Sequence, residues 1–356
     1  EELLEVFTLL NWAAAALQDA GRAPGDQHLK AIESVAPVLR ALRHADGALA
    51  RFHGGGRGPE GRLDRALATS GVRPAASGEL AMGFARISHG RTSVVVDAAK
   101  PPTGAASGNA HASTLSFELT SGRRPVVVNC GSGATFGKSW RRAGRATPSH
   151  STLGIDGLSS SRVSAAAPNG AGAELLTSTP RDVRFERSEV DGGTRVVTGH
   201  DGYDASHGLT HVRTLHLGYD GRSLRGEDAL VALDRSAQKR FELAFDRSKL
   251  QGIAFTIRFH LHPDVDVTLD MNGTAVSMAL KSGEIWVFRP QGEAHLMLES
   301  SVYLEKTRLS PRATKQVVLS GHAMEYSTRV IWSLAKAQET PDVVRDYATE
   351  DLMTAE

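Results

Sequence analysis

Side chains that can transfer protons, bind ions or hold a polar ligand gather in one stretch of the chain, between residues 107 and 157. Two apolar runs there, 115–119 and 126–128, predict neighbouring strands with a turn at Ser121-Gly122. The polar side chains stand at the expected strand ends, namely Asn109, His111, Asn129, Cys130 and His150. An imidazole can move a proton or bind a metal near neutral pH, whereas an amide only donates and accepts hydrogen bonds. A sheet that brings these strand ends together predicts a single polar site.

A dense basic run lies between Asn129 and His150. It contains Lys138, Arg141, Arg142 and Arg145. One interpretation is a solvated surface loop, which is what most charge runs form. The other is a surface that binds carboxylate or sulfate groups, because a guanidinium donates two parallel hydrogen bonds to such anions. On the second interpretation Arg141, Arg142 and Arg145 are candidate substrate-binding residues.

Most of the chain must form the scaffold for this site, and its pattern indicates a mainly β fold. From Ala81 to Leu334, short alternating apolar runs are separated by turns rich in Gly, Asp and Asn. Asp220-Gly221 and Asn272-Gly273 are typical of hairpin turns. This regular spacing predicts a large antiparallel β-sandwich over residues 75–345.

A short helical segment precedes the strands, over residues 1–70. Apolar residues at helical spacing predict helices over 2–19 and 26–44. Two helices cannot close a core alone, so they must pack against other structure. The Gly-rich stretch that follows includes His53-Gly54-Gly55-Gly56. It is either a linker or a loop whose backbone comes close to a ligand, because glycine lacks a Cβ.

Composition excludes several classes of protein. With 40% hydrophobic and 23% charged residues among 356, the chain suits a globular fold and not general disorder. A net charge of +1 gives no case for nucleic-acid binding by bulk electrostatics. The single cysteine, Cys130, excludes an intrachain disulfide. No uncharged stretch reaches the length of a bilayer-spanning helix, so we expect no membrane span.

Several motifs follow one another in a fixed order around the candidate residues. They read Asn109-Ala110-His111-Ala112-Ser113, Leu115-Ser116-Phe117-Glu118, Asn129-Cys130-Gly131, Arg145-Ala146-Thr147-Pro148-Ser149-His150 and Arg258-Phe259-His260-Leu261-His262-Pro263. In order and spacing they resemble the C-terminal domain of the heparinase II/III-like polysaccharide lyases, and the resemblance covers nearly the whole chain. It implies a β domain preceded by an α/α toroid, with residues 1–70 as the end of that toroid. Because the chain opens inside a helical pattern, we expect a preceding segment that carries the rest of the toroid.

The resemblance implies a lyase that cleaves a uronic-acid-containing glycan, such as a glycosaminoglycan, by β-elimination. Such a site neutralises the uronate carboxylate, removes the C5 proton with a base and protonates the leaving oxygen. Asn109 stands at the position of the catalytic histidine, and Tyr203, in His200-Asp201-Gly202-Tyr203, is expected to reach substrate as an acid or a stacking surface. Because an amide cannot shuttle protons, the alternative is a non-catalytic carbohydrate-binding or structural homologue.

The resemblance also implies a structural zinc ion. His111 and His150 match two histidine ligands, and Asn129 matches an aspartate ligand. Zinc takes three or four ligands of the His, Cys or carboxylate type, and Asn129 brings no negative charge. The alternative is that His111 and His150 form hydrogen bonds within the protein without a metal. The expected partner is an acidic polysaccharide, and the expected location is the bacterial periplasm or cell envelope.

Overall fold

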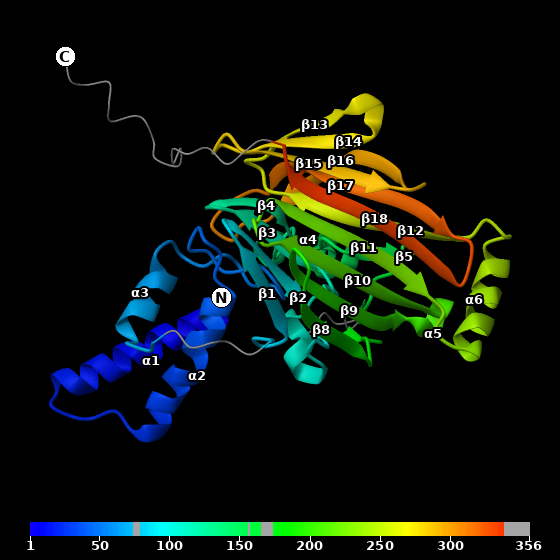
Figure 1. The fold of residues 1–356 in the computed structure, drawn as a ribbon. Coiled ribbons are helices and arrows are strands. Elements are labelled where there is room, and N and C mark those ends of the chain that lie inside the picture. Colours follow the sequence, from blue (N-terminus) through cyan, green and yellow to red (C-terminus); the bar gives the residue numbers. More distant parts are fainter. Residues whose placement is uncertain (74–78, 156, 165–173, 338–356) are drawn as a thin grey trace, which may run out of the picture.

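The computed structural model describes residues 1–73, 79–155, 157–164 and 174–337. Two antiparallel sheets of eight strands each form most of the structure (Figure 1). The first three helices of the chain pack together beside one end of the sheets. The predicted fold class, a mainly β sandwich after a short helical segment, is confirmed. Residues 338–345 of the predicted sandwich lie outside the described residues.

The first sheet carries the residues of the predicted site. Its strands run in the order β1-β2-β3-β4-β12-β17-β16, and β5 pairs with β12. Their bounds are β1 Phe84–His89, β2 Thr92–Asp97, β3 Phe117–Ser121, β4 Arg124–Val128, β5 Leu153–Ile155, β12 Ile253–Leu261, β16 His295–Tyr303 and β17 Arg312–Ala323. The strands β3 and β4 are neighbours, with their turn at Ser121-Gly122 as predicted.

The second sheet runs in the order β13-β14-β15-β18-β11-β10-β9-β8. Its bounds are β8 Val183–Val190, β9 Gly193–Tyr203, β10 Leu209–Gly218, β11 Ser223–Val231, β13 Asp266–Asp270, β14 Ala275–Ala279, β15 Ile285–Gln291 and β18 Ser327–Lys336. The predicted turns at Asp220-Gly221 and Asn272-Gly273 join β10 to β11 and β13 to β14. A separate short pair is formed by β6 Arg162–Val163 and β7 Leu176–Thr177.

Aromatic side chains from both sheets meet in the core of the sandwich. Phe117 of β3 stacks on Trp332 of β18, with ring centroids 5.8 Å apart and planes 6° from parallel. Phe259 of β12 meets the same indole edge-on at 4.7 Å. All three side chains are buried. Such pairs stabilise a core by about 0.5–1.5 kcal/mol beyond the burial of apolar area, so they fix how the two sheets face each other.

Six α-helices complete the described structure. Three pack together at the N-terminus around Leu4, Phe7, Leu39 and Leu63. The helices are α1 Glu2–Asp19, α2 Asp26–Ala41, α3 Arg62–Thr69, α4 Lys138–Arg145, α5 Asp204–His207 and α6 Arg235–Arg247. Four of them were not predicted from the sequence: α3 forms within the Gly-rich stretch, α4 in the basic run, and α5 and α6 between strands. The basic run forms α4, where a surface loop had been one interpretation. Among the described helices, none is long and apolar enough to cross a membrane.

A buried carboxylate joins the helical segment to the first sheet. Glu118 of β3 accepts hydrogen bonds from His44 Nε2 at 3.3 Å, from the Arg51 amide at 3.0 Å and from the Asn129 amide at 3.0 Å. Burial alone would raise the pKa of Glu118, but the bond from His44 and the charge of Arg51 hold it below its usual value. Glu118 is therefore ionised, and it fixes the loop after α2 against the end of β4.

Candidate functional site

A pair of buried histidines lies where the helical segment meets the sandwich. His111 Nδ1 and His150 Nε2 are 3.0 Å apart, and His150 Nδ1 lies 2.9 Å from the carbonyl oxygen of Ala146. A carbonyl only accepts, so His150 carries its proton on Nδ1, and His111 Nδ1 donates to His150 Nε2. This network assigns one neutral tautomer to each ring and leaves His111 Nε2 without a proton.

Both imidazoles are held neutral by their surroundings. Burial lowers the pKa of His150 to about 3, although the carbonyl of Ala146 favours the charged form. Burial, followed by the neighbouring His150 and His53, holds the pKa of His111 well below its usual value. A group that stays neutral at physiological pH can act as a hydrogen-bond partner or metal ligand, but it is a weak general base.

A third histidine, which sequence patterns did not assign to the site, supports this pair. His53 Nδ1 accepts a hydrogen bond from the amide of His111 at 3.1 Å, and His53 Nε2 lies 3.5 Å from Asp97 Oδ2. Asp97 also accepts from the Ser113 hydroxyl at 2.6 Å. The side chain of His53 is 20% exposed, so it is the histidine of the group nearest to solvent.

The Gly-rich loop closes over the same place. Gly54 has a φ of +76°, and a Cβ on it would lie 3.1 Å from the Asn109 carbonyl oxygen and 3.5 Å from His111 Nε2. A side chain there would strain the backbone and crowd the site. The loop is therefore part of the site and not only a linker, and its three glycines were the one local signal for this.

Asn109 is exposed at the surface of this junction. It ends the short 3-10 helix η1, Gly104–Asn109. Its side-chain amide donates to Glu2 of α1 at 3.2 Å, and its side-chain oxygen lies 3.4 Å from Arg141 of α4. Arg141 also donates to the carbonyl of Gly108 at 2.8 Å. The predicted residues Asn109 and Arg141 are thus in contact, and the Glu2 carboxylate marks the position of an anionic acceptor beside them.

Asn129 has a structural position behind the histidines. Its side-chain oxygen accepts from the amide of Ser151 at 3.0 Å, and its nitrogen lies 3.5 Å from Glu118 and from the Arg51 carbonyl. Asn129 thereby anchors the residue that follows His150. Within the described parts of the chain, no group of three His, Cys, Asp or Glu side chains could hold a metal ion. The zinc site of His111, Asn129 and His150 stays a prediction that lacks a third ligand of the His, Cys or carboxylate type, and no chemical step below depends on it.

Two of the three predicted arginine contacts belong to the scaffold. Arg145 is buried, and its guanidinium donates to the carbonyls of Ser107, Ala110 and Glu174 at 2.7–2.8 Å. The prediction that Arg145 binds substrate is therefore wrong, because its donors face the protein. Arg142 is exposed but pairs with the Glu174 carboxylate at 2.8 Å. Arg141 alone lies beside Asn109.

Tyr203 also requires correction. Its side chain is 0% exposed, and its hydroxyl donates to the Leu153 carbonyl at 2.9 Å inside the sandwich. Burial raises the pKa of the Tyr203 phenol. It cannot reach a polymer at the surface, so the prediction of a catalytic or stacking role is wrong. Burial alternates along β9 from Thr194 to His200, which alone would leave Tyr203 facing outward. The pairing with β10 shifts register between Leu209 and His211, so Tyr203 turns into the core, and the sequence motif gave no indication of that.

Comparisons with known proteins show which proteins this chain resembles. A family model described as heparinase II/III-like, C-terminal, matches residues 72–333. FtsZ-localized protein C of Caulobacter vibrioides is 28% identical over 342 residues, which cover 95% of this chain and 56% of that protein. A solved heparinase III aligns with a TM-score of 0.71 at 14% identity, covering 96% of this chain and 52% of its own. Heparan sulfate lyase HepC of Pedobacter heparinus aligns with a TM-score of 0.67 at 12% identity, covering 96% and 52%. The chain spans about half the length of these relatives.

Proposed function

Because this chain belongs to the heparinase II/III-like family, we propose that it takes an acidic, uronate-containing polysaccharide at the junction of its helices and its sandwich. The observation that supports this is the contact between Asn109 and Arg141 at an exposed surface. Glu2 already places a carboxylate 3.2 Å from the Asn109 amide. A uronate carboxylate offers the same acceptor oxygens to the amide and to the guanidinium.

In a β-elimination, these residues would serve the first requirement, which is to neutralise the uronate carboxylate. Arg141 supplies the positive charge, and Asn109 donates a hydrogen bond that orients the sugar ring. The neutral pair of His111 and His150 joins the segment that follows Asn109 to the turn that follows α4. The network therefore positions a substrate group and does not itself abstract a proton.

The base must come from elsewhere if the protein is a lyase. Of the tyrosines that the structure describes, Tyr203 and Tyr303 are buried. Tyr219 contacts His89 and Glu189, and Tyr326 bonds Glu242 at 2.5 Å, so both belong to other surfaces. We therefore propose that the proton-abstracting residue lies on the α/α toroid that the family resemblance implies, and we expect residues 1–356 to bind the polymer without cleaving it.

The second candidate is a carbohydrate-binding protein without catalytic activity. The observation that favours it is the amide at Asn109, which cannot transfer protons, beside imidazoles that remain neutral. The Caulobacter relative is named for its localisation to FtsZ and not for a reaction. On this alternative the protein would hold an envelope glycan, and the periplasmic or envelope location is part of the proposal.

Both candidates are tested with uronate polymers. A lyase that includes its toroid releases unsaturated products that absorb ultraviolet light. A binding protein releases none, but it migrates more slowly in a gel that contains the polymer. Asn109→Ala and Arg141→Ala are expected to weaken binding on either candidate. Arg184→Ala is a matched control, because Arg184 is 81% exposed and lies on β8 of the other sheet. Binding that is absent, or equal in all four proteins, would overturn the proposal.

A further inference from the structure

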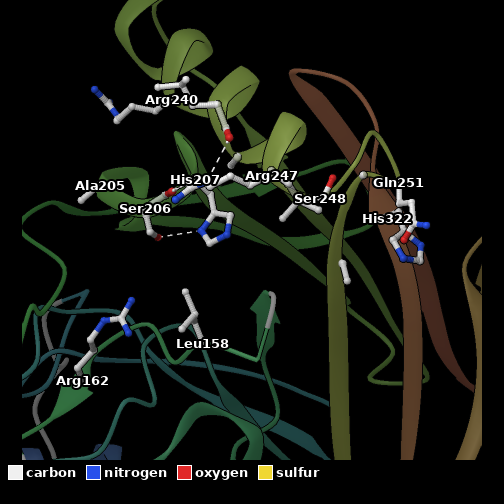
Figure 2. A pocket seen from close by; sticks show the side chains of 15 residues that line it. Leu158, Arg162, Ala205, Ser206, His207, Arg240, Arg247, Ser248, Gln251 and His322 are labelled. Carbon is white, nitrogen blue, oxygen red and sulfur yellow. Dashed lines mark hydrogen bonds between the residues drawn. The ribbon is translucent and has the colours of Figure 1, made fainter.

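A cavity of about 890 Å³ lies at the other end of the sandwich, between α5, α6, the start of β12 and the end of β17. Figure 1 places α5 and α6 at the opposite end of the sandwich from α1, α2 and α3. Figure 2 shows Leu158 and Arg162 on one side of the hollow and His207 with α6 on the other. Pockets of about 300–1,000 Å³ enclose molecules of drug size, so this cavity has room for more than one sugar ring.

The cavity wall carries positive charge that nothing in the wall neutralises. Arg240 is paired with Asp204 at 2.6 Å. Arg247 donates only to the neutral carbonyls of Leu243 and Ser206. The Arg162 side chain is exposed and has no hydrogen-bond or ion-pair partner among the described residues. None of the lining residues is Asp or Glu. Two guanidinium groups therefore face a space suited to an anion, although the whole chain carries a net charge of only +1.

The hollow continues over the surface, which suits an extended ligand. A neighbouring depression of about 290 Å³ shares Arg162, Ala205 and Ser206 with the cavity. It adds Arg181 and the hydroxyl groups of Ser159, Ser178 and Thr179. Its two carboxylates already have partners, because Asp204 is paired with Arg240 and Asp201 accepts from the backbone amides of residues 181 and 182. Hydroxyl groups and guanidinium groups in one groove are matched to the hydroxyls and acid groups of a sugar chain.

Other ligand classes fit this lining poorly. Neither hollow has a Phe, Tyr or Trp in its wall, so a nucleotide base has no aromatic ring to stack on. The cavity has no carboxylate in its wall for a hard cation. Apolar groups are present, among them Leu158, Leu243 and Ile253, and they can cover the apolar face of a sugar ring.

We propose that this cavity is a second binding site, which takes a short acidic oligosaccharide with its carboxylate or sulfate on Arg162 and Arg247. The polymer class rests on the proposed function, but the site itself rests on its own charges and shape. Two sites at opposite ends of the sandwich would hold different segments of one long polymer, and such linked binding raises overall affinity without new contacts.

The test is titration calorimetry with digalacturonate on the Asn109→Ala/Arg141→Ala protein, whose junction is disabled. Arg162→Ala and Arg247→Ala are each expected to weaken this binding by about tenfold, because each removes a charge-assisted hydrogen bond. Ala254→Trp is expected to abolish binding without a change of charge, because exposed Ala254 lines the cavity. Arg184→Ala is the charge-matched control and should bind within about twofold of its parent protein.

Four other results would overturn the proposal. The first is digalacturonate binding that persists in Arg162→Ala/Arg247→Ala and in Ala254→Trp. The second is equal affinity for the neutral disaccharide galactobiose. The third is inorganic sulfate that competes at equal affinity, because the site would then hold an anion and not a sugar. The fourth is binding by the wild-type protein that disappears in the junction variant, which would leave the junction as the single site and support the proposed function alone.

Discussion

Replacement of Glu118 by alanine is expected to loosen the joint between the helices and the sandwich. The change removes the acceptor of His44, of the Arg51 amide and of the Asn129 amide, which are bonded at 3.0–3.3 Å in a buried place. Loss of one partner from a buried charged network costs about 3–5 kcal/mol. Glu118→Gln retains one acceptor oxygen but loses the charge, so we expect about 1–3 kcal/mol.

Urea unfolding followed by circular dichroism measures both losses, and hydrogen exchange locates them. The amides of Arg51 and Asn129 should exchange faster in Glu118→Ala, because both donate to the missing carboxylate. Glu186→Ala is the control, since Glu186 is exposed on β8, and it should change the free energy of unfolding by less than about 0.5 kcal/mol. If Glu118→Ala cost as little as Glu186→Ala, the carboxylate would not join the two parts.

The ionisation of Glu118 adds a pH dependence to this prediction. Its pKa is lowered in the folded protein from the ordinary 4.5. An acid with a lowered folded pKa stabilises the fold above its unfolded pKa, and this stability is lost as pH falls below about 4.5 and through the folded pKa. Glu118→Gln should lack that part of the acid-induced loss, and an unchanged acid profile would contradict the assignment.

Three further predictions concern residues near the candidate site. Tyr203→Phe should lower the free energy of unfolding by about 1–3 kcal/mol, because it leaves the buried Leu153 carbonyl without its donor. Calorimetry should show unchanged polymer binding, and a loss of binding would restore a role for Tyr203 in the site. Arg145→Ala should lower the free energy of unfolding in urea by at least about 2 kcal/mol, because three carbonyls lose their donor. Arg142→Ala should cost less than about 1 kcal/mol, and equal losses would refute this division of roles. Because the pKa of His150 falls to about 3 in the folded protein, the free energy of unfolding should decrease as the pH falls from about 6.5 towards 3. If His150→Gln folds, its free energy of unfolding, measured in urea, should depend less steeply on pH over that range.

The sandwich could be predicted from the sequence because its signals are local. Alternating apolar residues and the turns at Asp220-Gly221 and Asn272-Gly273 specify strands and reversals within a few residues. The helix α6 also had a local signal that was missed. Ala237, Phe241 and Ala244 are buried at helical spacing, and Asp234 accepts the first-turn amide of Ala237.

The site was less predictable because its contacts join distant parts of the chain. His53 meets His111 across 58 positions, and Asn109 meets Glu2 across 107. The directions of Tyr203 and Arg145 also depend on tertiary packing, since one side chain turns into the sandwich and the other towards three backbone carbonyls. A motif gives a residue its place in the chain, but packing decides whether its functional group meets solvent.

The central claim is that Asn109 and Arg141 bind a uronate carboxylate at the junction, and calorimetric titration with a uronate oligosaccharide tests it most directly. The cavity should first be closed by Ala254→Trp, so that the junction is measured alone. In that protein Asn109→Ala should weaken binding by about 2- to 10-fold, because it removes a neutral hydrogen bond. Arg141→Ala should weaken it by about tenfold or more, because a charge-assisted hydrogen bond is stronger. Arg184→Ala should leave the affinity unchanged. Affinity that stays the same in Asn109→Ala and Arg141→Ala would contradict the claim.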